Sequence, residues 1–72
     1  MIELTKIGDS YEKLLNPVKI FINIDNILHF HKNESSEFTI IQFVNHRVYV
    51  SETTEEIKRK IQNVKGSNFI LN

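Results

Sequence analysis

Three histidines are the side chains in this sequence whose type and spacing could serve metal chemistry. His29 and His31 are two positions apart in a stretch that predicts a β-strand, so they would share one face, and His46 falls in a predicted turn. Three imidazoles are the smallest set of protein ligands that holds zinc. The alternative is solvated histidines on the polar side of a half-exposed strand, without a partnering carboxylate or base. We therefore expect no metal site and no cofactor.

A cluster of cations near the C-terminus could contact phosphate, because nucleic-acid-binding surfaces concentrate lysine and arginine. The cluster consists of Lys58, Arg59, Lys60 and Lys65. The alternative is helix solvation, since Glu55 precedes Arg59 and Glu56 precedes Lys60 by four residues, the spacing of helical ion pairs. Nucleic-acid binding is therefore kept as the alternative function and is not the first choice.

Several apolar side chains are not required by the predicted inner face of the sheet, and aromatic residues are enriched in the cores of protein interfaces. We expect them to form a partner surface. The alternative is a C-terminal tail that folds back over the outer face of the sheet. The residues of this expected surface are Phe21, Tyr49, Phe69, Ile70 and Leu71.

Signatures of catalysis are missing from the sequence. It contains no nucleophile elbow, no pair of spaced carboxylates and no phosphate-binding loop. Such a loop is rich in glycine, and the sequence has only two glycines. We expect no catalytic residues and no enzymatic activity.

Composition favours one small domain, residues 1–72. A chain of 72 residues buries a thin core, and without cysteine it has no disulfide or thiolate metal site to add stability. Association into a homodimer is one way to supply the missing stability. Nine basic and nine acidic residues balance, so no overall field attracts nucleic acid or an anionic membrane.

The N-terminus reads Met1-Ile2-Glu3 and lacks the basic start and apolar core of a signal peptide. No apolar run approaches the ~20 residues that span a bilayer. We expect a cytoplasmic protein without a membrane partner, and an unidentified protein as its binding partner.

The elements that position these side chains are strands and one helix. Alternating apolar residues predict strands over 2–6, 18–24, 28–32 and 47–51, and a β-branched and aromatic run that is apolar on both faces predicts a strand over 38–44. In the second strand Ile20, Ile22 and Ile24 share a face, and in the third Leu28 and Phe30 point inward. A turn at residues 8–10 precedes a helical turn over 11–15, which Pro17 ends. Asn45 and His46 predict the turn of the last hairpin.

A capping box predicts where the helix begins. Thr53 is the expected N-cap and Glu56 lies three residues later. Ile57, Ile61 and Val64 form one apolar stripe, and Gly66 is the expected stop, so the helix should cover residues 54–65. A short apolar tail would follow. The fold class is α+β: a small, strongly bent antiparallel sheet of about five strands, half of a barrel, with one C-terminal helix packed on it.

Two segments carry a resemblance to a known family. The segments Ile20-Phe21-Ile22-Asn23-Ile24-Asp25-Asn26-Ile27 and Val48-Tyr49-Val50-Ser51-Glu52-Thr53-Thr54-Glu55-Glu56-Ile57, joined by Thr39-Ile40-Ile41, resemble the small flagellar and swarming-motility proteins of the FlbD/SwrD type. The opening Met1-Ile2-Glu3-Leu4-Thr5 fits as well. This sequence has His46 where the family has a turn glycine. The resemblance implies a short, cytoplasmic, non-enzymatic accessory or regulatory factor.

A second resemblance is to the LytTR type of DNA-binding domain. It is carried by Ile24-Asp25-Asn26-Ile27-Leu28-His29-Phe30 and by Phe69-Ile70-Leu71-Asn72. The basic, histidine-bearing segment through which that family contacts DNA would begin where this sequence ends. The resemblance implies an accessory domain for nucleic-acid binding.

Overall fold

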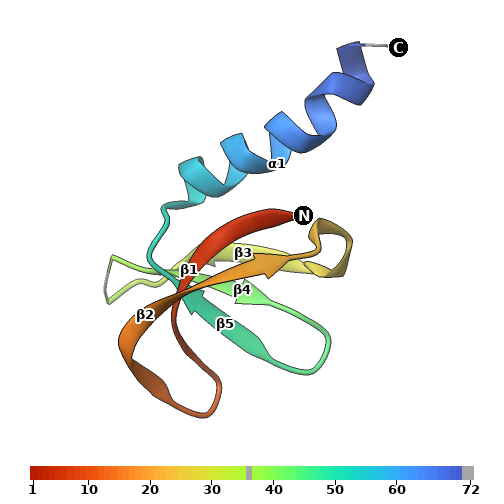
Figure 1. The fold of residues 1–72 in the computed structure, drawn as a ribbon. Coiled ribbons are helices and arrows are strands. Elements are labelled where there is room, and N and C mark those ends of the chain that lie inside the picture. Colours follow the sequence, from red (N-terminus) through yellow and green to blue (C-terminus); the bar gives the residue numbers. More distant parts are fainter. Residues whose placement is uncertain (36, 71–72) are drawn as a thin grey trace.

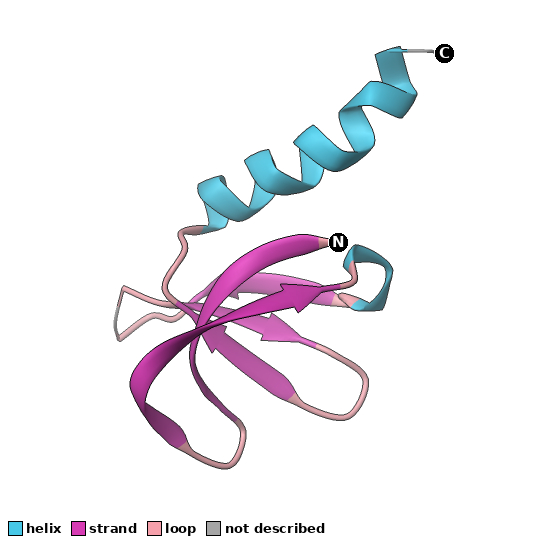
Figure 2. Ribbon diagram, viewed as in Figure 1, coloured by secondary structure: helices cyan, strands magenta, loops and turns pink. Residues whose placement is uncertain are grey.

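The structure is a computed structural model that describes residues 1–35 and 37–70, with side chains described up to Lys65. Within these ranges the chain forms five strands, one short 3-10 helix (η1) and one α-helix (Figures 1 and 2). In chain order the elements are β1 (Ile2–Asp9), β2 (Lys13–Ile22), η1 (Ile24–Asn26), β3 (His29–Lys32), β4 (Thr39–Gln42), β5 (Arg47–Val50) and α1 (Thr54–Ile70).

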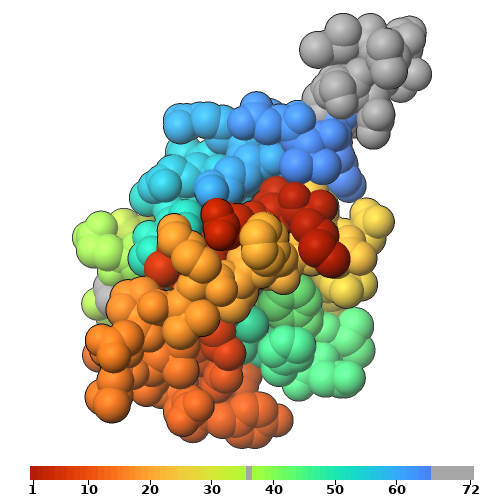
Figure 3. Space-filling model, in the orientation of Figure 1, coloured from red at the N-terminus to blue at the C-terminus, as the bar shows by residue number. Residues whose placement is uncertain are grey.

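The strands form one antiparallel sheet in the order β2-β1-β5-β4-β3. The sheet is strongly bent and does not close, and α1 lies across it on one side (Figures 1 and 3). These features confirm the predicted α+β class. Within the described residues, β2 and β3 are the two edges of the sheet.

The core lies between the sheet and the first half of α1. Strand alternation puts every second side chain of β1, β4 and β5 on the helix side of the sheet. Ile57 enters this layer from α1 and is fully buried, whereas Ile61 is half-buried and Val64 is exposed. The helix therefore docks through its N-terminal half. The buried apolar residues are Ile2, Leu4, Ile22, Ile41, Val48, Val50 and Ile57.

The start of α1 confirms the capping box. The Glu56 amide donates to Thr53 Oγ1 at 3.1 Å, and the Thr53 amide donates to Glu56 Oε1 at 3.4 Å. The expected stop at Gly66 is wrong, because the helix continues to Ile70. Glycine disfavours a helix by only about 1 kcal/mol relative to alanine. This cost does not end a helix that already extends over twelve residues.

The two helical ion pairs expected from the sequence are also absent. Among the described residues, the ion pairs join Lys6 to Asp9 and Lys65 to Asp25. The reason lies in competing partners. The Glu56 carboxylate is used by the capping box, and Lys60 Nζ donates to the Glu3 carbonyl at 3.0 Å.

The helical turn expected over residues 11–15 is wrong, because β2 already begins at Lys13. The side chain of Asp9 makes the connection: its Oδ1 accepts the amides of Tyr11 at 2.8 Å and Glu12 at 3.1 Å. The Asp9 amide in turn donates to the Glu12 carbonyl at 2.9 Å. These bonds reverse the chain within three residues, so it resumes as a strand.

The last hairpin turns one residue earlier than expected. The Phe43 amide donates to the His46 carbonyl at 2.9 Å and Gln42 pairs with Arg47, so the two central residues are Val44 and Asn45. No described residue has a positive φ, so the tolerance of asparagine for that region is not used. The shift preserves which side chains face the core, because it moves the pairing by two residues.

Candidate functional site

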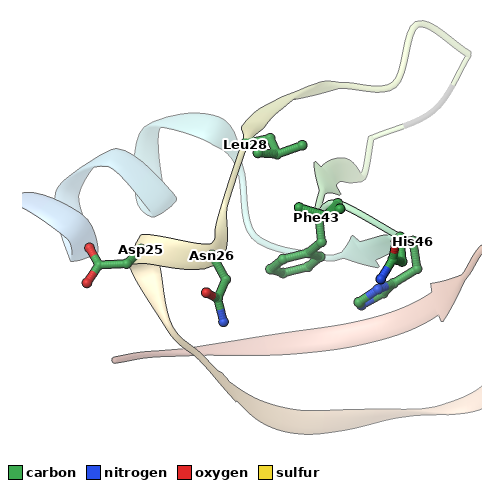
Figure 4. A pocket seen from close by; sticks show the side chains of 7 residues that line it. Asp25, Asn26, Leu28, Phe43 and His46 are labelled. Atoms are coloured by element: carbon green, nitrogen blue, oxygen red, sulfur yellow. The ribbon is translucent and has the colours of Figure 1, made fainter.

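The candidate site is a pocket beside the tip of the β4–β5 hairpin, which we call the hairpin pocket. It has a volume of about 270 Å³ and lies between the segment that leads into β3 and the hairpin turn (Figure 4). Two chain segments that are far apart in sequence therefore build it. Its lining residues are Asp25, Asn26, Leu28, Phe43, Val44, Asn45 and His46.

The floor of the hairpin pocket is an aromatic pair at the hairpin tip. The rings of Phe43 and His46 stack with their centroids 4.9 Å apart. Gln42 holds the tip in place, because its amide nitrogen donates to the Phe43 carbonyl at 2.7 Å and to the His46 carbonyl at 3.3 Å. Arg47 Nε donates to the amide oxygen of the same glutamine at 3.0 Å. The turn is thus braced by side chains as well as by the strand ladder.

The rim of the hairpin pocket is apolar and exposed. Leu28 is 60% exposed and Val44 is 76% exposed. The Leu28 amide donates to the Gln42 carbonyl at 2.9 Å, which fixes this rim residue beside the hairpin. The prediction that Leu28 points inward is wrong: β3 begins at His29, and Phe30 is the half-buried residue packed on the core.

Polar groups at the other side of the pocket come from η1. The Asn23 side chain accepts the Asp25 amide at 3.0 Å and caps this short helix. In Figure 4 the Asn26 side chain extends toward the space beside the Phe43 ring, whereas the Asp25 side chain points away from it. Asp25 Oδ1 lies 3.8 Å from Lys65 Nζ of α1. The pocket therefore combines the apolar side chains of Leu28, Phe43 and Val44 with polar side chains, among them the two amides of Asn26 and Asn45.

Two residues of the predicted partner surface lie on different parts of the sheet. Phe21 is 69% exposed on the edge strand β2, opposite Glu3 of β1. Tyr49 is half-buried on β5, opposite Gly8 of β1. Glu3 and Gly8 are five residues apart along β1, about 16 Å at ~3.3 Å per residue. The structure therefore does not bring Phe21 and Tyr49 together.

The Tyr49 ring packs against Phe38 instead, with the ring centroids 5.2 Å apart. A second pocket of about 240 Å³ lies beside Phe38 and is lined by Ile7, Glu37, Phe38 and Ser51. At Phe69 and Ile70 the structure describes only the helical backbone, and Leu71 lies outside the described residues. The extended tail expected for this segment is replaced by helix up to Ile70.

Of the four basic residues proposed to contact phosphate, two have protein partners. These are Lys60, bound to the Glu3 carbonyl, and Lys65, close to Asp25. Lys58 and Arg59 are exposed on α1. Near them, the Thr54 hydroxyl donates to Glu55 Oε1 at 2.9 Å and lowers the pKa of that carboxyl, to which the positive charge of Lys58 adds a smaller effect. The cations of the helix therefore share their surface with carboxylates.

The histidines do not gather at one point. The rings of His29 and His31 stack on β3 with their centroids 5.6 Å apart, while His46 stacks on Phe43 at the hairpin tip. Among the residues that the structure describes, no three His, Cys, Asp or Glu side chains are grouped so as to hold a metal ion.

Sequence reasoning missed the apolar residues of the hairpin pocket. One signal was present: Val44 stands at the centre of a tight turn, where Gly, Asn, Asp, Ser and Pro dominate. The pocket also requires that Leu28 and Phe43 lie on the same side of the hairpin pocket lining, and their relative position depends on the register of β3 and β4.

Over the described part of the chain, no helix has both the length and the apolar character needed to cross a membrane. Three comparisons, with models of protein families, with curated proteins and with solved structures, found no match.

Proposed function

We propose that this protein is a small, non-enzymatic, cytoplasmic protein-interaction module that binds an apolar side chain of a partner protein in the hairpin pocket. The observation that carries the proposal is the exposure of Leu28 and Val44 in the pocket that the stacked rings of Phe43 and His46 also line. Large apolar side chains that converge on a concave site are typical of binding surfaces and cost free energy when left in water.

The size and rigidity of the hairpin pocket support this function. A volume of about 270 Å³ accommodates one large side chain and is small for a drug-sized ligand, whose sites measure roughly 300–1,000 Å³. Binding energy in protein interfaces concentrates in a few such anchor side chains. Because Gln42 already braces the turn, little conformational entropy is lost when an anchor enters.

The resemblance to FlbD/SwrD-type proteins agrees with an accessory or regulatory role of this kind. The LytTR-like alternative, nucleic-acid binding through the basic residues of α1, has less support. Lys60 and Lys65 already have partners, and the acidic and basic residues of the chain balance. Binding of duplex and single-stranded DNA at two salt concentrations tests the alternative, because phosphate contacts produce a steep loss of affinity with salt.

A display experiment tests the proposed function. Random heptapeptides displayed on phage are selected on the wild-type protein, and the enriched peptides are measured against variants by titration calorimetry. We expect the peptides to share one large apolar residue and to bind at least about tenfold more weakly to Val44→Ser and to Leu28→Ser.

The matched control is Leu15→Ser, since Leu15 is 99% exposed on β2 and does not line the hairpin pocket. This variant should bind the selected peptides as the wild type does. Peptides that bind all three variants equally, or a selection that enriches none, would contradict the proposed function.

A further inference from the structure

The outer edge of β2 has backbone groups that no described strand binds. Residues Val18–Ile22 pair in regular antiparallel register with Ile2–Lys6 on one side. On the other side they lie at the edge of the sheet that the described residues form. The outward N–H and C=O groups of an edge strand can bind another extended chain.

The hydrogen bonds of Thr5 show which groups of β2 point outward. The Thr5 amide donates to the Glu52 carboxylate, and the Thr5 carbonyl accepts the Ser51 amide at 3.0 Å, so both groups point away from β2. A residue opposite such a position in an antiparallel ladder also turns its backbone groups away. Thr5 is opposite Lys19, so the Lys19 N–H and C=O point to the open edge, and the alternation of the ladder gives Phe21 the same direction.

Two further groups at the ends of this edge follow from the same alternation. The Val18 amide and the Ile22 carbonyl point to β1, so the Pro17 carbonyl and the Asn23 amide, on the far side of the same planar peptides, point outward. Proline has no N–H, and the Asn23 carbonyl already accepts the Asn26 amide at 3.0 Å. The outward groups are the carbonyls of Pro17, Lys19 and Phe21 and the amides of Lys19, Phe21 and Asn23.

This set of groups is complementary to itself about a two-fold axis beside Ile20. An antiparallel second copy with its Ile20 opposite Ile20 places its Phe21 opposite Lys19, and each of these two residues donates its N–H to the carbonyl of the other. Asn23 of the second copy falls opposite Pro17, where its amide meets the Pro17 carbonyl. The donor that proline lacks falls opposite the carbonyl that η1 already uses. Every outward donor therefore meets an outward acceptor.

The neighbouring two-fold registers leave groups unpaired. An axis at Lys19 puts two lysines directly opposite each other and places the Phe21 carbonyl opposite Pro17, which has no N–H to donate. An axis at Phe21 places the Lys19 amide opposite the Asn23 carbonyl, which η1 already uses. Of the registers centred on these three successive residues, the one centred on Ile20 pairs all of the outward groups.

The side chains on the helix side of the sheet also match in this register. Ile22 is buried there and Ile20 packs against the core, whereas Val18, on the same face, is 49% exposed. Across the axis Ile20 meets Ile20 of the second copy, and Val18 meets Ile22 of the second copy. The apolar row of β2 thus continues into the second copy and covers Val18.

The opposite face of the sheet combines an aromatic ring with opposite charges. Phe21 is 69% exposed, with Glu3 beside it on β1 and Lys19 of the second copy on its other side. The two copies of Lys19 are diagonal to each other and not directly opposite. Lys19 Nζ donates to the Thr5 hydroxyl at 3.0 Å, and this hydroxyl donates to the Glu52 carboxylate at 2.9 Å. An acid of the same chain therefore offsets the charge of Lys19.

We propose that the chain forms a two-fold homodimer in which Val18–Ile22 pairs antiparallel with the same strand of a second copy, with Ile20 opposite Ile20. The five strands of each copy then form one continuous sheet, with both copies of α1 on the same side (Figure 1). This gives a specific geometry to the homodimer expected from the short chain. The hairpin pocket is lined by none of these residues, so the dimer does not depend on the proposed function.

Sedimentation equilibrium of the full chain tests the proposal. We expect the average mass to rise from one chain toward two between about 10 µM and 1 mM protein, since a short edge gives a weak interface. Lys19→Pro removes an outward amide, which an edge strand tolerates, and should leave a folded monomer over this range. The matched control Lys19→Ala keeps the amide and should still dimerise. The dispersion of the NMR amide signals shows that each variant is folded.

A charge exchange tests the register without proline. Phe21→Lys places a lysine opposite Lys19 of the second copy at two symmetric positions and should weaken dimerisation about tenfold. Adding Lys19→Glu to this variant places opposite charges across the edge and should restore the dimer. Val44→Ser, in the hairpin pocket, should leave dimerisation unchanged.

A wild-type chain that remains monomeric at about 1 mM would overturn the proposal. A folded Lys19→Pro variant that still dimerises would do the same, because the outward amide would then be unused. If Lys19→Pro does not fold, the charge exchange decides, and a double variant no more dimeric than Phe21→Lys alone would contradict the register centred on Ile20.

Discussion

The carboxylate of Glu52 binds the backbone amide of Thr5 through both of its oxygens, at 2.8 and 3.0 Å, and accepts the Thr5 hydroxyl at 2.9 Å. The two residues are 47 positions apart in sequence. Glu52 is buried, and its own carbonyl accepts the Thr39 hydroxyl at 2.7 Å. The segment between β5 and α1 is therefore fastened to β1 by a side chain and to β4 by a backbone group. Since α1 begins two residues later, this contact sets where the helix docks on the sheet.

Replacing Glu52 with alanine should destabilise the protein. The change leaves the Thr5 amide without its acceptor in a partly buried place, which costs about 1–3 kcal/mol of unfolding free energy. Urea denaturation measures the loss. The control is Glu12→Ala, since Glu12 is exposed and should change stability by less than about 0.5 kcal/mol. Equal effects of both substitutions would show that the Glu52 contact contributes no stability.

The capping box and the docked face of α1 should contribute to stability by different amounts. Thr53→Ala removes the acceptor of the Glu56 amide and should cost about 1 kcal/mol, whereas Thr53→Ser keeps it and should cost little. Ile57→Ala creates a cavity beneath the helix and should cost about 2–5 kcal/mol. Denaturation curves of the three variants check this order. A small loss for Ile57→Ala would mean that the helix is not docked through this residue.

Asp9 should make the stability of the β1–β2 connection depend on pH. The amide of Tyr11 lowers the pKa of Asp9 below its ordinary value of 3.8, helped by the Lys6 ammonium group and the Glu12 amide. Because the folded-state pKa is depressed, the stabilisation is fully present above the unfolded-state pKa. It is lost as the pH falls through the folded-state pKa. We expect the carboxyl ¹³C signal of Asp9 to titrate below the ordinary value of 3.8.

Asp9→Asn is the matched variant for this pH dependence. It keeps an oxygen that can accept the Tyr11 and Glu12 amides but removes the titrating charge beside Lys6. Its unfolding free energy should fall less than that of the wild type as the pH drops below about 4. Parallel pH profiles of the two proteins would contradict the assignment.

The sequence predicted those features that local chemistry determines. The capping box of Thr53 and Glu56 and the shared buried face of Val48 and Val50 in β5 need only neighbouring residues. The turn expected at residues 8–10 is present, but the return to a strand at Lys13 was not predicted, because the Asp9 side chain accepts the amides that a helical turn would have used. The Glu52–Thr5 contact and the hairpin pocket were not predicted either. Both depend on strand order and register, which join segments distant in the sequence.

The two glycines should respond to alanine in opposite directions. At Gly8 an added Cβ would lie 3.1 Å from the Glu12 carbonyl oxygen and 3.4 Å from Cδ2 of Tyr49, which covers this position from β5. Gly8→Ala should therefore destabilise the protein by about 1–3 kcal/mol, the usual cost of overpacking. At Gly66 the backbone is helical, and Gly66→Ala should raise the helicity of α1, since alanine favours a helix by about 1 kcal/mol.

Far-ultraviolet circular dichroism and thermal denaturation measure both glycine variants. The double variant Gly8→Ala with Tyr49→Ala separates crowding by the ring from crowding by the backbone. If the ring is the obstacle, the cost of Gly8→Ala shrinks in the Tyr49→Ala background. If the Glu12 carbonyl is the obstacle, the cost remains, because the turn that Asp9 fixes cannot move aside. The shorter distance predicts the second result. A Gly66→Ala variant with unchanged helicity would contradict a helix that continues past this residue.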